Sequence, residues 1–85
     1  MSASRVAKNV YAAQLAGEAV ILHLDTKRYY RLNATGAEVW KGIEAGESRE
    51  VLVERLVREF TVERDVAAAE VDRLVERLRE AHLIE

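Results

Sequence analysis

The side chains with the widest chemical range in this chain are its two histidines. His23 and His82 stand 59 positions apart, and neither has acidic residues around it at the spacing of a metal-ligand cluster. The sequence contains no cysteine, which excludes a thiolate nucleophile, a thiolate metal site and a disulfide. We therefore interpret His23 as a residue on the face of a strand and His82 as the end of the last helix, and we expect no metal site.

Carboxylates are numerous in the second half of the chain, but their spacing is typical of helix surfaces rather than of an acid–base pair. Glu54, Glu59, Glu76 and Glu80 fall on outer helix faces, where partners four residues away are available. With only four glycines, the chain has no G-x-S-x-G nucleophile elbow, no P-loop and no G-x-G-x-x-G dinucleotide motif. We predict that the protein is not an enzyme and takes no cofactor.

The most informative pattern is a pair of tyrosines, Tyr29-Tyr30, in a short strand that leads into a helix. One interpretation is a hairpin strand whose aromatic side chains cover the core. The other is a free strand edge that accepts an extended peptide by strand addition, so that backbone amides supply the affinity. Lys27, Arg28 and Arg31 either blunt this edge against aggregation or attract an acidic peptide. The residues alone leave both interpretations open.

A sheet is needed to position these side chains, and the first third of the chain predicts one. Strands are expected over residues 9–14, 18–24 and 27–32, with a turn at Ala16-Gly17 between the first two. Side chains two residues apart share a face of a strand. This alternation predicts a common core face made of Val20, Leu22, Leu24, Tyr30 and Leu32.

The remainder of the chain predicts three helices. Thr35 and Glu38 have the spacing of a capping box at the start of the first helix, which Gly46 ends. Ser48 is expected to cap the second helix, which runs to Phe60, and the third helix spans about residues 63–81. Their inward stripes are Leu52, Val53, Leu56, Val57 and Phe60 in the second, and Ala67, Val71, Leu74 and Leu78 in the third.

Three short strands followed by three helices predict an α+β fold in a single domain over residues 1–85. We expect a winged helix-turn-helix-like arrangement, in which one face of a three-stranded antiparallel sheet packs on the helices. The stripe of the third helix is wider than a buried seam requires, because Ala68 and Val75 extend it toward Asp72 and Arg79. These residues either floor a groove beside the free strand edge or, in the case of Val75, pack against the other helices.

The distribution of charge argues against a nucleic-acid partner. Residues 1–33 carry five basic and two acidic side chains, whereas residues 34–85 carry eight basic and thirteen acidic ones. Nucleic-acid-binding domains usually present a basic helix, and the helical part here is acidic. No segment approaches the roughly 20 apolar residues that span a bilayer. We expect no nucleic acid, no membrane and a cytoplasmic location, which the absence of cysteine fits.

The segment Tyr30-Arg31-Leu32-Asn33-Ala34-Thr35-Gly36, followed by Trp40, carries a resemblance to a known family. Together with the strand Glu18 to Asp25, its Y-x-L-N-x-[TS]-G pattern resembles the PqqD-like leader-peptide recognition domains. These domains serve pathways that make ribosomally synthesised, post-translationally modified peptides. The resemblance covers nearly the whole chain and is strongest for the stand-alone leader-binding protein of lasso-peptide pathways.

What the resemblance implies is a domain that binds the leader peptide of a precursor as an extra strand. The leader would lie antiparallel to the third strand, in the groove between that strand and the third helix. It would be presented to a transglutaminase-like leader peptidase, which then feeds a cyclase. The implied peptide-binding residues are Lys27, Arg28, Tyr29, Tyr30, Arg31 and Leu32 on the edge, and Ala68, Val71, Asp72, Val75 and Arg79 on the helix. On this assignment, Val75→Glu is expected to block peptide binding.

Two departures from the family pattern bear on this expectation. Members often have a glycine before the final Leu-[LI], where this chain has His82, and the turn before Tyr29 contains no glycine. The pyrroloquinoline quinone branch, whose members act as peptide chaperones for a radical SAM enzyme, usually has a cysteine-containing segment after the first helix. The segment Gly42 to Gly46 has no cysteine, which disfavours that branch.

Two rival functions follow from the same fold class. A winged-helix DNA-binding protein would need a basic second helix, and residues 48–60 instead mix three arginines with three glutamates. A gel shift with duplex DNA at low salt would reveal it. A small dimerisation or adaptor domain would appear as a concentration-dependent dimer in sedimentation.

Overall fold

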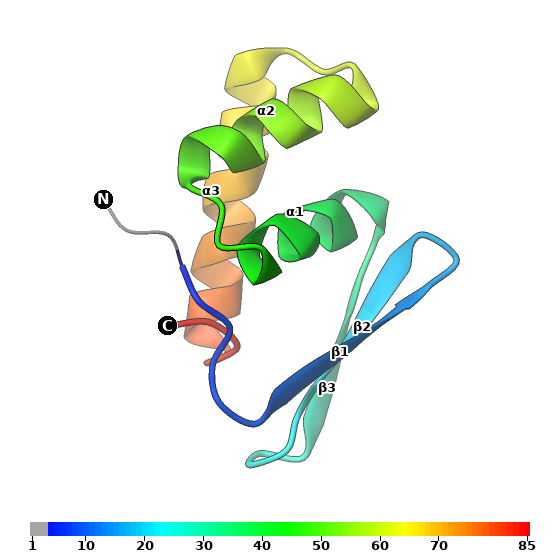
Figure 1. Ribbon diagram of the computed structural model, residues 1–85, viewed down its shortest axis with the longest axis vertical. Coiled ribbons are helices and arrows are strands. Elements are labelled where there is room, and N and C mark those ends of the chain that lie inside the picture. The colour runs from blue at the N-terminus through cyan, green and yellow to red at the C-terminus, as the bar shows by residue number, and fades with distance from the viewer. Residues whose placement is uncertain (1–3) are drawn as a thin grey trace.

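The computed structural model describes residues 4–85, and its first half is an antiparallel sheet of three strands (Figure 1). The strands are β1 (Val10–Leu15), β2 (Glu18–His23) and β3 (Arg28–Leu32), in the spatial order β1-β2-β3. Ala16 and Gly17 join β1 to β2 with φ values of 51° and 81°. Two consecutive positive φ angles characterise the tight turn that matches the twist of a hairpin. The predicted turn is confirmed.

The core face of β2 is the opposite of the one predicted. Ala19, Ile21 and His23 are buried, whereas Val20 and Leu22 lie on the outer face of the sheet and Leu24 falls in the turn. The register explains the phase, because Ile21 pairs with Tyr30 and Ala19 with Leu32, and directly paired residues share a face. Residues 19–22 are all apolar, so this run has no polar alternation that could reveal its phase.

The turn between β2 and β3 closes without a glycine. Lys27 adopts the left-handed region with a φ of 64°, and its amide donates a hydrogen bond to the carbonyl of His23 at 2.9 Å. Lys27 therefore belongs to the turn, and the strand predicted to begin there begins at Arg28. The edge presented by β3 runs from Arg28 to Leu32.

The cap of helix α1 (Ala34–Glu44) lies two residues before the predicted one. Asn33 is the cap, and its side-chain oxygen accepts a hydrogen bond from the amide of Gly36 at 3.0 Å. The prediction of a capping box at Thr35 and Glu38 is therefore wrong. Asparagine is as good a cap as serine or threonine, and it stands in extended conformation at the end of the strand segment. Glu38 is instead free to pair with arginine on the next helix.

The other two helices follow the predicted boundaries closely. Helix α2 (Arg49–Phe60) is capped by Ser48, whose hydroxyl accepts from the amide of Val51 at 3.4 Å, and it ends at Thr61 in the left-handed conformation. Helix α3 (Arg64–Glu80) follows after a short connection.

The end of α3 forms a Schellman motif around His82. The amide of His82 donates to the carbonyl of Arg79 at 3.0 Å, and that of Leu83 donates to Leu78 at 2.9 Å. His82 has a φ of 61°, which is the conformation that glycine favours at this position. The histidine therefore takes the backbone geometry that glycine usually takes at the end of a helix. Leu78 and Leu83, at the two positions that such a motif brings together, are both buried in the core.

The layers of the fold leave a gap between the edge of the sheet and the last helix. The sheet packs on α1, while α3 packs on α2 (Figure 1). Among the largest side chains of the common core are Ile21, Trp40, Leu56 and Leu83, and the two ends of the chain meet where Val6 bridges to Ile84. The three-stranded antiparallel sheet followed by three helices confirms the predicted α+β class.

Residues 4–85 contain neither a candidate membrane span nor a candidate metal site. No helix there combines the length and apolar character that a membrane span needs. That part of the chain also holds no cluster of three or more His, Cys, Asp or Glu side chains placed to bind a metal ion.

Candidate functional site

The gap between β3 and α3 is an open groove of about 880 Å³. Its strand side is formed by Arg28, Tyr30 and Leu32, which alternate onto the core face of the sheet. Its helix side is formed by Leu74, Arg77 and Leu78. Leu83, at the end of the chain, completes the apolar floor. The groove thus has an apolar centre with cationic side chains at both ends.

The strand that borders this groove has a free edge. β3 pairs with β2 alone, and no strand within residues 4–85 occupies its other side. A free edge presents a row of backbone donors and acceptors to any extended chain. Together, the edge and the groove floor can hold one additional strand whose alternate side chains point toward α3.

The groove continues past Leu32 toward the start of α1. A hollow of about 350 Å³ lies between Leu32, Gly36, Leu74 and Arg77, and a smaller one of about 80 Å³ follows beside Glu70 and Arg73. Leu74 and Arg77 line all three spaces. The row of α3 that faces the strand is therefore the one that contains these two residues.

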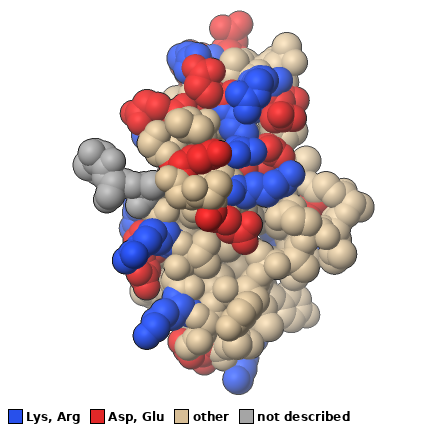
Figure 2. Space-filling model, viewed as in Figure 1, with Lys and Arg blue, Asp and Glu red and all other residues tan. Residues whose placement is uncertain are grey.

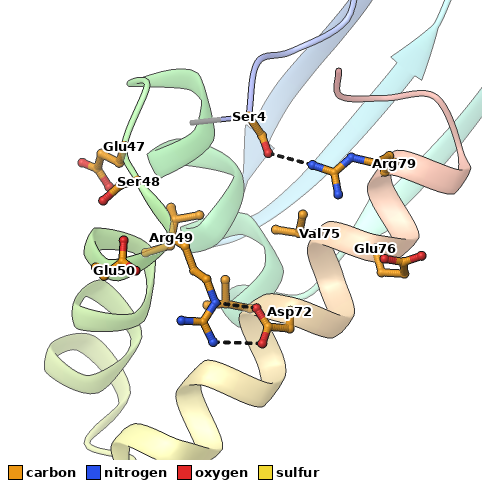
Figure 3. Close-up of a pocket in the computed structure, with 11 residues that line it drawn as sticks. Ser4, Glu47, Ser48, Arg49, Glu50, Asp72, Val75, Glu76 and Arg79 are labelled. Carbon is orange, nitrogen blue, oxygen red and sulfur yellow. Dashed lines mark hydrogen bonds and ion pairs between the residues drawn. The ribbon is translucent and has the colours of Figure 1, made fainter. Parts of the chain in front are cut away.

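The predicted helix residues lie on a different flank of α3 (Figure 3). Val71, Asp72, Val75 and Arg79 line a separate hollow of about 380 Å³, whose opposite wall is the start of α2. Val71 is itself buried in the core, and Ala68 is half-buried against it. None of these residues lines the groove beside β3, and their part in peptide binding stays a prediction.

Polar contacts cross this second hollow and tie α3 to α2 and to the start of the chain. Arg49 donates to both carboxylate oxygens of Asp72, at 2.7 and 2.9 Å, and Arg79 donates to the hydroxyl of Ser4 at 3.2 Å (Figure 3). The hydrogen bond from Arg49 lowers the pKa of Asp72. Because the pair is exposed, its contribution to stability is small.

Helical phase explains why the flank could not be assigned from the sequence. Leu74, Arg77, Leu78 and Ala81 repeat at the three- and four-residue spacing of one face. Ala68, Asp72, Val75 and Arg79 repeat in the same way on the next face. Both faces contain apolar residues, so hydrophobicity alone does not distinguish them. Leu74 and Leu78 were both predicted as core. Leu78 is buried as predicted, whereas Leu74 is half-buried, and its position on the groove shows only when α3 is placed beside the sheet.

The two tyrosines have different surroundings. Tyr30 is half-buried and lines the groove, whereas Tyr29 lies in a row with Tyr11 and Leu22 on the outer face of the sheet. Tyr29 is 71% exposed and Tyr11 is 60% exposed. In Figure 2, charged side chains crowd over the helices, while the hairpin of β1 and β2 is almost free of them. Of the two tyrosines, only Tyr30 lies on the side of the sheet that faces the groove, so only its side chain can contact a ligand bound there.

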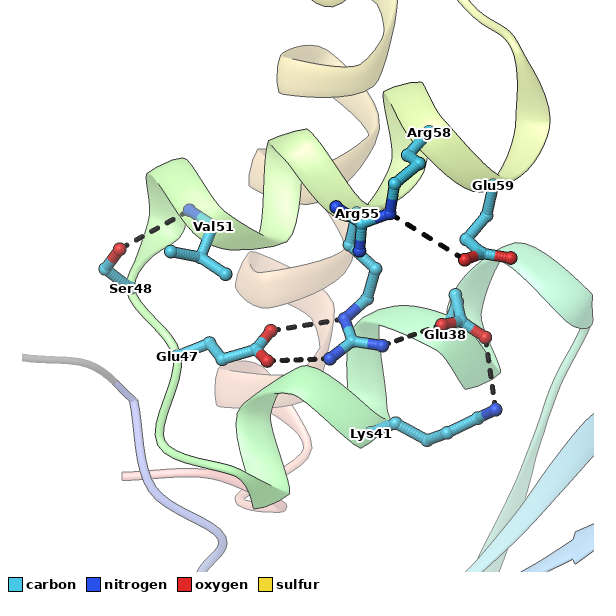
Figure 4. A network of polar contacts seen from close by, with 8 residues as sticks. All are labelled: Glu38, Lys41, Glu47, Ser48, Val51, Arg55, Arg58 and Glu59. Atoms are coloured by element: carbon cyan, nitrogen blue, oxygen red, sulfur yellow. Dashed lines mark hydrogen bonds and ion pairs between the residues drawn. The ribbon is translucent and has the colours of Figure 1, made fainter.

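A charged network fixes α1 against α2 away from the groove (Figure 4). Arg55 binds Glu47 in a bidentate pair, at 3.1 and 2.7 Å, and also reaches Glu38 at 2.8 Å. The hydrogen bond from Arg55 is the main cause that lowers the pKa of Glu38. A Cβ at the nearby Gly42 would clash with Leu52 and lie 2.7 Å from Glu47 Oε1. The helices approach closely here, and the network holds the scaffold rather than a ligand.

Comparison with known proteins gives one family and two similar structures. The family model described as coenzyme PQQ synthesis protein D (PqqD) matches residues 18–84. The structure of TbiB1 in complex with the TbiA(beta) leader peptide is 28% identical over 95% of this chain and 94% of that one, with a TM-score of 0.90. A lasso peptide synthetase B1 complexed with the leader peptide is 27% identical over 96% of both chains, with a TM-score of 0.87. None of the curated proteins matches the chain.

Proposed function

The chain belongs to the family of coenzyme PQQ synthesis protein D, and from that premise we propose that it binds the leader peptide of a lasso-type precursor. It acts as a recognition element that holds the substrate and does not convert it. The leader adds to β3 as a further strand and lies in the groove between β3 and α3.

The observation that carries this proposal is the coincidence of a free strand edge with an apolar groove of the right shape. The edge of β3 supplies backbone partners, and Tyr30, Leu74 and Leu78 supply apolar contacts beside it. Two similar solved structures, which cover nearly the whole chain, are each complexes with a leader peptide. The chain keeps the features that such a ligand requires.

The energetics of strand addition explain why the groove must have a floor. Ordering a disordered leader costs on the order of 2–5 kcal/mol, which backbone hydrogen bonds exchanged with water do not offset by themselves. Side chains of the added strand alternate, so every second one meets the apolar centre around Tyr30 and Leu78. A few buried anchor residues of the leader then carry most of the affinity.

We assign the binding surface to Arg28–Leu32 of β3 and to Leu74, Arg77 and Leu78 of α3. Lys27 stands in the turn at one end of the edge, and Tyr29 and Arg31 point to the outer face, where they flank the added strand. This replaces the helix surface expected around Asp72, Val75 and Arg79, which lines the second hollow.

The partners that follow are the enzymes that process the precursor in the cytoplasm. We propose that the captured leader is presented to a transglutaminase-like leader peptidase, and that the peptidase product passes to a cyclase. Binding would raise the effective concentration of the precursor at these enzymes without any chemistry on this chain.

The proposal is tested by calorimetric titration of the protein with the leader of the small precursor encoded beside its gene. We expect saturable binding with a negative heat-capacity change, because apolar surface is buried. A scrambled leader of the same composition is the control and should not saturate. Equal binding of both peptides, or of neither, would refute leader recognition.

A further inference from the structure

The groove beside β3 and the second hollow of α3 have opposite charge. Arg28, Arg77 and Glu80 line the groove, and Arg31 borders it from the outer face of the sheet, so three arginines stand against one glutamate. The second hollow is lined by four carboxylates and two arginines. An acidic segment of peptide would therefore be drawn to the groove and repelled from the other side of the same helix.

Within the groove, Arg77 is the cation best placed to pair with an acidic group of a ligand. It lines the groove and both of its extensions, and it is exposed. Two neighbouring arginines already have ion-pair partners, since Arg31 pairs with Glu18 at 3.1 Å and Arg73 pairs with Glu70 at 2.7 Å. Within residues 4–85, no ion pair involves Arg77. Arg28 is likewise unpaired there, but it shares its end of the groove with Glu80.

The order of the lining residues sets the spacing between an apolar anchor and an acid. The extension beside Leu32 contains Leu74 and Arg77 but not Leu78, so Arg77 reaches toward the Leu32 end while Leu78 lies nearer the centre. Leu78 and Leu74 are about one turn of α3 apart, roughly 5.4 Å, which nearly matches the roughly 6.6 Å between side chains on one face of a strand. Arg77 lines the same extension as Leu74, so consecutive inward positions of an added strand meet first Leu78 and then Leu74 with Arg77.

We infer that the groove selects leader segments in which an acidic side chain stands two residues from an apolar anchor. This rests on the function proposed above and names the chemistry of its ligand. The anchor lies between Tyr30 and Leu78, and the carboxylate pairs with Arg77 on the side toward Leu32. The planar guanidinium can hold a carboxylate by two hydrogen bonds, and the added strand covers the pair from solvent.

The ligand chemistry can be found without knowing the precursor. Displayed peptides of random sequence, about twelve residues long, are selected on the full chain, and amide shifts of the protein locate each selected peptide. We expect enrichment of Asp or Glu two positions from a large apolar residue, with shifts at β3 and at Leu74 to Leu78.

A charge exchange then tests the contact itself, by fluorescence anisotropy. Replacing the acid of a selected peptide with Lys should weaken binding to the parent chain about tenfold, which is about 1.4 kcal/mol. Arg77→Glu should weaken the acidic peptide by a similar factor and recover the Lys peptide. Arg79→Glu makes the same charge change in the same last turn of α3, but on the other flank, and should leave both affinities within about twofold.

The outcomes separate this inference from the function on which it rests. Selected peptides that shift β3 and α3 but show no acidic preference, or that bind Arg77→Glu as well as the parent, would overturn the acidic specificity and leave strand addition standing. Peptides that bind elsewhere, or a selection that yields none, would overturn both. An equal effect of Arg77→Glu and Arg79→Glu would show that net charge, and not the contact, is responsible.

Discussion

His82 shows how a single residue can carry strain in a well-packed helix end. It holds a left-handed conformation with a φ of 61° although it has a Cβ, which disfavours that region by about 1 kcal/mol. We therefore predict that His82→Gly raises the free energy of unfolding by about 0.5–1 kcal/mol. Urea denaturation followed by the fluorescence of Trp40, which is fully buried, measures the change.

The control for this prediction is His82→Ala. Alanine removes the same imidazole but keeps the Cβ, so it should not stabilise the protein. A gain as large for alanine as for glycine would show that the side chain, and not the backbone conformation, is the source of the strain.

Glu38 should make the stability of the fold depend on pH in the acidic range. Its side chain is 16% exposed and that of Arg55 is 19% exposed, so the pair is shielded from solvent. Because its pKa is lowered below the ordinary 4.5, ionised Glu38 contributes stability above that value, and the contribution is lost as the pH falls through the lowered pKa. We predict that Glu38→Gln loses about 1 kcal/mol at pH 7 and is less sensitive to acid than the parent.

Urea unfolding at pH 7 and at about pH 3 checks the prediction for Glu38. Asp72→Asn serves as the comparison, since the pKa of Asp72 is also lowered but its pair with Arg49 is exposed. Asp72→Asn should change the free energy of unfolding at pH 7 by less than about 0.5 kcal/mol. If the free energy of unfolding fell by the same amount between pH 7 and pH 3 in the parent and in Glu38→Gln, the pair of Glu38 with Arg55 would not be the source of the acid sensitivity.

At the scale of elements, the decisive question is which flank of α3 contacts the leader. Leu74 and Val75 are consecutive and both half-buried, but Leu74 lines the groove beside β3 and Val75 lines the second hollow. We predict that Leu74→Glu weakens leader binding at least tenfold, because the charge would be buried against the added strand. Val75→Glu should bind within about twofold of the parent.

Calorimetry with the leader measures both variants, and thermal melts confirm that each is folded. If Val75→Glu abolished binding while Leu74→Glu retained it, the leader would occupy the flank first expected from the sequence. The assignment of the groove would then be wrong.

Element boundaries were largely predictable because local signals set them. Ser48 caps α2, Thr61 ends it, and the turn at Ala16-Gly17 forms as expected. The phase of β2 was not predictable, since four consecutive apolar residues fit either face and only pairing with β3 decides. The cap of α1 was mistaken because Thr35 has the capping-box spacing to Glu38, whereas Asn33, the residue directly after β3, is the one that caps the helix.

At the scale of the whole molecule, the layered arrangement explains why a binding groove exists at all. The sheet packs on α1 and the last helix packs on α2, so β3 and α3 face each other across an open groove. The network of Arg55 with Glu38 and Glu47 fixes the two halves in this relation (Figure 4). The sequence predicted the edge and the class of ligand, but the facing flank of α3 emerges only from this three-dimensional arrangement.

The most direct test of the account is an amide-NMR titration of the protein with the leader of the neighbouring precursor. Strand addition at the proposed groove predicts saturable shifts concentrated at Arg28–Leu32 and at Leu74, Arg77 and Leu78, and slowed hydrogen exchange of the β3 amides that the leader pairs. Saturable shifts confined to Asp72, Val75 and Arg79, or the absence of any saturable shift, would contradict it.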